Sequence, residues 1–80
     1  MDELITVVFT KVGNTEQLDD VISSANYLVV HKLEQNNGTV AYVFQGIVAE
    51  NAYDLFRALL DDAGLEDVNV VISAGNAFQR

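Results

Sequence analysis

The sequence predicts one α+β domain in which four strands form an antiparallel sheet and two helices cover one of its faces. Apolar runs and helical repeats alternate along the 80 residues in the order strand, helix, strand, strand, helix, strand. Asn36-Asn37-Gly38 stands between the two middle strands and is typical of a hairpin turn. The predicted strands span about 4–9, 27–34, 39–45 and 68–72, the predicted helices about 15–25 and 51–63, and the tail 73–80, all within one domain of residues 1–80.

The first strand and first helix have clear local signals. Residues 4–9 are apolar on both faces apart from one threonine, which is typical of a central strand. Asn14 is the expected N-cap, with Gln17 at the capping-box position, and Asn26 can end the helix in the left-handed conformation. The buried stripe of this helix is predicted to comprise Leu18, Val21, Ile22 and Ala25.

The hairpin can pair in two registers. A two-residue loop at Asn37-Gly38 puts Leu33 opposite Tyr42 and His31 opposite Phe44, and this register is preferred. A three-residue loop with a bulge would shift the pairing, so that one strand changes face.

The second helix is expected to start at Asn51 or Glu50 and to end before Gly64, a residue suited to the left-handed position after a helix. Its apolar stripe is predicted to comprise Ala52, Leu55, Phe56, Leu59, Leu60 and Ala63.

Right-handed crossovers place both helices on one face of the sheet. The first and third strands are apolar on both faces and belong in the centre, whereas Lys32 and Glu34 suit an edge strand. The predicted strand order is 4-1-3-2. This arrangement resembles the ferredoxin-like split βαβ fold.

The second face of this sheet has no predicted element to cover it. A contiguous apolar patch on a small domain usually marks an interface. The residues predicted to form this interface are Leu4, Thr6, Val8, Leu28, Val30, Ala41, Val43 and Val71.

The composition limits the partners and the compartment. Twelve acidic residues face four basic ones, and the formal charge of −8 disfavours nucleic acids and anionic membranes. Cysteine is absent, which rules out disulfides and thiolate chemistry and fits a reducing interior. The start of the chain is acidic and no apolar run is long enough to cross a bilayer, so we expect a cytoplasmic protein.

Few residues suggest chemistry. The single histidine, His31, is expected to be a partly buried, hydrogen-bonded ring on the sheet, and no cofactor or metal is expected. Neighbouring carboxylates in Asp19-Asp20 and Asp61-Asp62 diverge around their helix axes and cannot hold one ion together. Arg57 lies within reach of Asp54 and Asp61, so we expect a surface ion pair.

One loop has ligand potential. Residues 10–15 join a central strand to a helix N-terminus, where free N–H groups favour an anion. The candidate binding residues are Lys11, Gly13, Asn14 and Thr15. In strand order and in Gly13 the chain resembles amino-acid-binding regulatory domains of the ACT type, and the resemblance implies a ligand near this loop.

The sequence therefore favours a small, acidic, non-enzymatic interaction or regulatory module that acts through its open sheet face. It would form a homodimer or dock on a partner protein. An inhibitor that mimics nucleic acid by its acidity is a special case. The alternative is a small-ligand sensor that uses residues 10–15.

Overall fold

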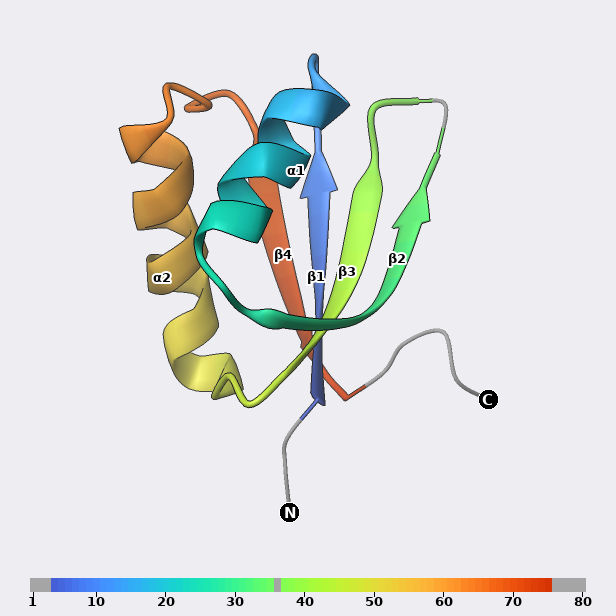
Figure 1. Cartoon of the computed structure of the whole chain (residues 1–80), viewed down its shortest axis with the longest axis vertical. Coiled ribbons are helices and arrows are strands. Elements are labelled where there is room, and N and C mark those ends of the chain that lie inside the picture. Colours follow the sequence, from blue (N-terminus) through green and yellow to red (C-terminus); the bar gives the residue numbers. More distant parts are fainter. Residues whose placement is uncertain (1–3, 36, 76–80) are drawn as a thin grey trace.

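The structure is a computed structural model that describes residues 4–35 and 37–75. Figure 1 shows one sheet with both helices in front of it. The elements are β1 (Leu4–Thr10), α1 (Thr15–Ser24), β2 (Leu28–Glu34), β3 (Val40–Gln45), α2 (Ala49–Asp62) and β4 (Asn69–Ala74).

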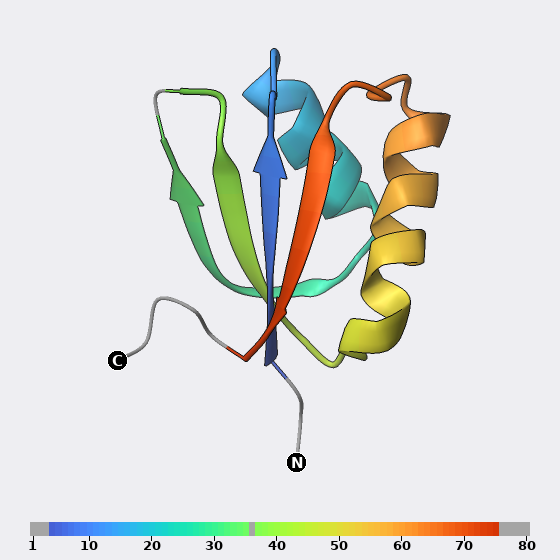
Figure 2. The same ribbon diagram turned by 180° about the vertical axis from the view of Figure 1, so that it is seen from behind.

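The sheet is antiparallel and its strand order is β2-β3-β1-β4. This is the predicted order read from the other edge, and the ferredoxin-like α+β fold is confirmed. β1 and β3 lie in the centre because their side chains are apolar on both faces. The helices cover one face only, and Figure 2 shows the opposite face uncovered by either helix.

An aromatic cluster fills the space between the sheet and α2. The Phe56 ring of α2 lies 4.9 Å from Phe44, 5.9 Å from Phe9 and 5.7 Å from Tyr27, measured between ring centroids. Phe9, Phe44 and Phe56 are fully buried. Most of these pairs are edge-on or tilted, which is the favourable arrangement for aromatic rings.

The predicted start of α1 is confirmed, although the capping box is not. The side chain of Asn14 accepts a hydrogen bond from the backbone N–H of Gln17 at 3.1 Å. The Gln17 side chain does not return to the cap, because its Nε2 donates to the carbonyl of Ala63 at the end of α2, at 3.1 Å. Asn26 ends the helix with φ of 65°, as expected.

α2 begins at Ala49, earlier than the predicted Glu50 or Asn51. Val48 occupies the N-cap position and makes no side-chain capping bond. Ile47 is buried in the core just before this point, so packing rather than a capping side chain sets where the helix begins. Gly64 follows the helix with φ of 78°, as its sequence position suggested.

Arg57 does more than form the expected surface ion pair. Its Nη2 lies 3.0 Å from the Asp61 carboxylate, while no ion pair with Asp54 forms among the described side chains. Its Nη1 donates to the carbonyl of Val68 at 2.6 Å, and its Nη2 also donates to the carbonyl of Glu66 at 3.2 Å. The guanidinium therefore links α2 to the segment that connects α2 with β4.

The preferred hairpin register is wrong. Leu33 lies opposite Ala41 and His31 opposite Val43, and Gln35 N–H donates to the Thr39 carbonyl at 2.8 Å across a three-residue loop. Of the loop residues that the structure describes, Gly38 has a positive φ, 79°, and Asn37 does not. A three-residue loop needs the left-handed conformation only at its last position, which suits glycine.

A β-bulge between Val29 and His31 compensates for this shift, with Val30 as the extra residue. Val29 consequently stays beside Phe44 on the helix side, as predicted. His31 and Leu33 lie on the open face instead of the predicted helix side. Lys32 and Glu34, which alternate with them, lie on the helix side instead of the open face.

The last strand is longer than predicted. β4 runs to Ala74, and Gly75 N–H then donates to the carbonyl of Leu4 at 2.7 Å. Residues 73 and 74 therefore belong to the sheet and not to a tail. The rest of the predicted tail, residues 76–80, lies outside the described residues.

Candidate functional site

The predicted interface residues do gather on the open face, but their exposure is uneven. Thr6 and Val43 are fully buried and Ala41 nearly so, whereas Leu28 and Val71 are more than half exposed. The Thr6 hydroxyl donates to the carbonyl of Gly75 at 2.8 Å. Leu4 and Val8 are half-buried, and Val30 sits in the bulge rather than in the regular ladder. The exposed apolar surface therefore lies at the margins of this face.

Strand β2 supplies most of that surface. Every one of its seven residues is exposed. Four of them are aliphatic, with exposed fractions of 61% for Leu28, 39% for Val29, 49% for Val30 and 38% for Leu33. In Figure 1 both helices lie toward the β1 and β4 side of the sheet, which leaves β2 without a helix in front of it.

The backbone of β2 is open as well. β2 is an edge strand, and among the described residues no strand pairs with its outer side. Edge strands present unpaired N–H and C=O groups that can pair with another chain. We call the segment Leu28–Glu34 the β2 edge. It combines an unpaired backbone with exposed aliphatic side chains.

A polar cluster sits on the helix side of the β2 edge and ties it to α1. Lys32 Nζ lies 3.2 Å from Asp19 Oδ1 and 3.9 Å from Glu34 Oε1. The Tyr42 hydroxyl donates to the same Asp19 oxygen at 3.2 Å, and Lys32 Nζ lies 5.6 Å from the Tyr42 ring centroid. Burial raises the pKa of the Tyr42 phenol well above its usual range, and the negative charges of Asp19 and Glu34 raise it further.

The raised pKa of Tyr42 predicts a loss of stability in alkali. The phenol of the unfolded chain ionises near its ordinary pKa of about 10, whereas the phenol of the folded chain stays neutral there. The contribution of Tyr42 to the free energy of unfolding is therefore fully present below that pH and declines above it. Chemical denaturation from neutral pH to about pH 11 should show a steeper decline for the native chain than for Tyr42→Phe. The exposed Tyr53 is the control, and Tyr53→Phe should decline like the native chain. Parallel curves for the native chain and Tyr42→Phe would contradict the assignment.

The loop between β1 and α1 is tied into the fold. Val12 is buried, and its N–H donates to the carbonyl of Gly38 at 2.9 Å. Asn14 uses its side-chain oxygen for the helix cap. Lys11 has φ of 61° and, like Gly13, is exposed. The candidate residues Lys11, Gly13, Asn14 and Thr15 thus lie together at one end of the sheet, and ligand binding there stays a prediction.

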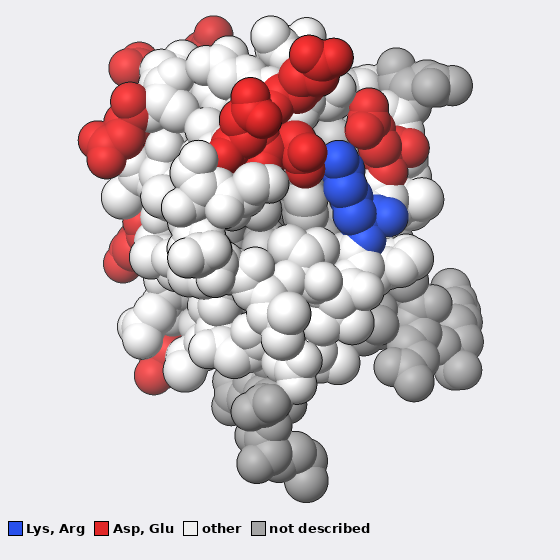
Figure 3. Space-filling view, viewed as in Figure 1, with Lys and Arg blue, Asp and Glu red and all other residues white. Residues whose placement is uncertain are grey.

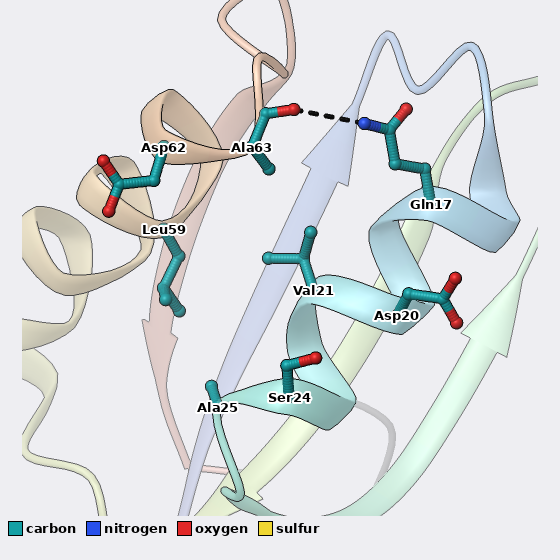
Figure 4. A pocket seen from close by; sticks show the side chains of 8 residues that line it. All are labelled: Gln17, Asp20, Val21, Ser24, Ala25, Leu59, Asp62 and Ala63. Carbon is teal, nitrogen blue, oxygen red and sulfur yellow. Dashed lines mark hydrogen bonds between the residues drawn. The ribbon is translucent and has the colours of Figure 1, made fainter.

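A shallow groove of about 360 Å³ separates the two helices (Figure 4). Gln17 closes one end of it through its bond to Ala63, and Asp20 and Asp62 point away from it on opposite sides. Its lining residues are Gln17, Asp20, Val21, Ser24, Ala25, Leu59, Asp62 and Ala63. The polar side chains that line this groove therefore do not converge on a common point where a ligand could be held.

Among the charged side chains visible on the helical face, acidic ones predominate, and they gather toward its upper part and its left edge (Figure 3). Lys32 and Arg57, two of the described cations, are each paired with a carboxylate. The pair between Lys32 and Asp19 connects the β2 edge to the acidic side chains of α1.

His31 is exposed on the open face rather than partly buried as expected. The described residues contain no group of three or more His, Cys, Asp or Glu side chains placed to hold a metal ion. No helix within residues 4–35 and 37–75 combines the length and apolar character needed to cross a bilayer.

Scans of the chain against protein-family models, curated proteins and solved structures find no match. The feature missed at the sequence level is that every residue of β2 is exposed. Lys32 and Glu34 indicated an edge strand, but nothing in the sequence indicated that the helices would lie toward the β1 and β4 side of the sheet rather than over β2.

Proposed function

We propose that this chain is a non-enzymatic protein-interaction module whose contact surface is the β2 edge together with the exposed margin of the open face. One observation carries the proposal. A seven-residue edge strand is exposed along its whole length although four of its side chains are aliphatic. Long exposed apolar edges invite pairing with other chains, and proteins normally shorten or charge them.

The chemistry of such a contact follows from the strand. The backbone of the β2 edge offers hydrogen bonds to an added strand, which is the general mode of β-augmentation. Leu28 and Leu33 would bury apolar area on the open face, beside His31. Lys32 and Glu34 would fix the register through charge.

Three of the other charged side chains, Asp19, Asp61 and Arg57, have structural partners, which supports structural roles for them rather than catalytic ones. Asp19 accepts hydrogen bonds from Lys32 and Tyr42, and Asp61 pairs with Arg57. The contacts of Asp19 join α1 to the hairpin. Arg57 joins α2 to the turn that leads into β4 through its bonds to the carbonyls of Glu66 and Val68.

Charging the apolar side chains of the β2 edge tests the proposal. The double variant Leu28→Glu/Leu33→Glu should fold like the native chain, because both positions are exposed. Its association, with itself or with a captured partner, should weaken about tenfold or more, since each lost 1.4 kcal/mol of binding energy is a factor of ten. Sedimentation and quantitative pull-down measure this.

The matched control is Tyr53→Glu, which charges an exposed aromatic residue of α2 on the other side of the molecule. It should bind like the native chain. Equal association by the double variant and the native chain would refute the proposed surface.

A further inference from the structure

We propose that the β2 edge pairs with the β2 edge of a second copy of this chain, antiparallel and centred on Leu33. This inference rests on the proposed function and names the partner. The pairing would join the two four-stranded sheets into one continuous sheet around a twofold axis.

The backbone of β2 decides which residues can pair outward. The bond from Gln35 N–H to the Thr39 carbonyl shows that residue 35 points its backbone groups toward β3. In an antiparallel ladder this direction alternates along the strand, so Leu33 and His31 also point inward. The N–H and C=O groups of Lys32 and Glu34 consequently point outward, toward a second chain.

Charge then selects the register between two copies. Centring the pair on Leu33 puts Lys32 of each copy opposite Glu34 of the other, so that opposite charges meet twice. Centring it on Lys32 instead puts the two lysines opposite each other, which is destabilising. A further slip places Lys32 and Glu34 opposite the aliphatic residues Val30 and Leu28. The segment Lys32-Leu33-Glu34 is thus complementary to itself in one register.

The surroundings of Lys32 fit this register. Its ammonium group already lies 3.2 Å from Asp19 and 3.9 Å from Glu34 on the helix side of the strand. Residues directly opposite each other in a sheet share a face, so Glu34 of the second copy would arrive on that same side. Leu33 of each copy would meet its counterpart on the open face, where 38% of it is exposed in the single chain.

The bulge at Val30 limits this contact. A bulge bends and twists its strand, which carries Val29 and Leu28 out of line with the added strand. The ladder is therefore confined to about residues 31–35 of each copy. Because both copies use the same segment, the contact is self-complementary and closes as a dimer rather than extending into a fibre.

A charge-swap experiment tests this pairing. In a dimer of Lys32→Glu, the acidic residue 32 of each copy would face Glu34 of the other. In a dimer of Glu34→Lys, the basic residue 34 of each copy would face Lys32 of the other. Each variant should therefore weaken self-association about tenfold or more in sedimentation experiments at physiological salt, where the net charge of the molecule is screened. An equimolar mixture of the two variants should restore a heterodimer, because the acidic edge of one chain then faces the basic edge of the other.

Two variants with the same changes of charge serve as controls. Lys11→Glu and Asp54→Lys alter exposed residues outside β2 and should dimerise like the native chain. Circular dichroism of every variant checks that the fold is intact.

Each other outcome overturns the self-pairing. A native chain that stays monomeric at its highest attainable concentration overturns the self-pairing. The proposed function then survives only if the native chain captures a different partner that Leu28→Glu/Leu33→Glu no longer binds. A native dimer that is unchanged in Lys32→Glu and Glu34→Lys also does so. A mixture that fails to associate, while the native dimer is lost in Leu28→Glu/Leu33→Glu, keeps the surface but refutes the register.

Discussion

Replacing Phe56 with alanine is expected to destabilise the fold by about 3–5 kcal/mol, the range for truncating a large buried aromatic side chain. Phe56 is fully buried and its ring contacts Phe9, Tyr27 and Phe44. It is the side chain through which α2 meets three aromatic rings at once. A domain of this size has a total stability of only about 4–12 kcal/mol, so the variant should be partly or wholly unfolded.

Urea denaturation followed by circular dichroism measures this effect. Tyr53→Ala is the matched control, because it truncates another aromatic residue of the same helix at a position that is 49% exposed. It should lower the denaturation midpoint only slightly. Similar losses for the two variants would mean that α2 does not pack through Phe56 as described.

Gly38→Ala is expected to lower the free energy of unfolding by about 1–3 kcal/mol, because two effects act at the added Cβ atom. Gly38 has φ of 79°, a conformation that disfavours a Cβ atom. A Cβ built there would also lie 3.0 Å from the backbone carbonyl oxygen of Val12, which cannot move away as a flexible side chain could. The variant should lower the denaturation midpoint and loosen the hairpin against the loop before α1.

Gly13 provides the comparison. It lies in the adjacent loop, its φ is outside the left-handed region, and no atom lies within 4 Å of the position of an added Cβ. Gly13→Ala should therefore leave stability unchanged or slightly improved, because alanine restricts the unfolded chain. A Gly38→Ala variant as stable as Gly13→Ala would show that the Gly38–Val12 contact does not constrain the hairpin.

The order of elements was predictable because each strand and helix carries its own periodicity and end signals. Asn14, Asn26 and Gly64 act as the sequence suggested, since capping and left-handed positions depend on local chemistry. The hairpin register was not predictable, because Asn36-Asn37-Gly38 is compatible with two loop lengths. Only the observed pairing of Gln35 with Thr39 decides between them.

The candidate site was predictable only in part. Alternation along β1 and β3 correctly assigned Thr6, Val8, Ala41 and Val43 to the open face. The exposure of β2 could not be predicted, because it depends on the lateral position of the helices over the other face of the sheet. That position is set by packing between distant residues, such as Phe56 against Phe44, rather than by any local pattern.

The place of β1 in the sheet has a consequence for biosynthesis. β1 lies between β3 and β4, and its residue Ile5 pairs with Ala74 near the other end of the described chain. β1 is synthesised before β4 and must therefore wait for it before both of its sides are paired. Contacts between such distant residues slow folding. During translation one side of an aliphatic strand stays unprotected until residues 69–74 emerge.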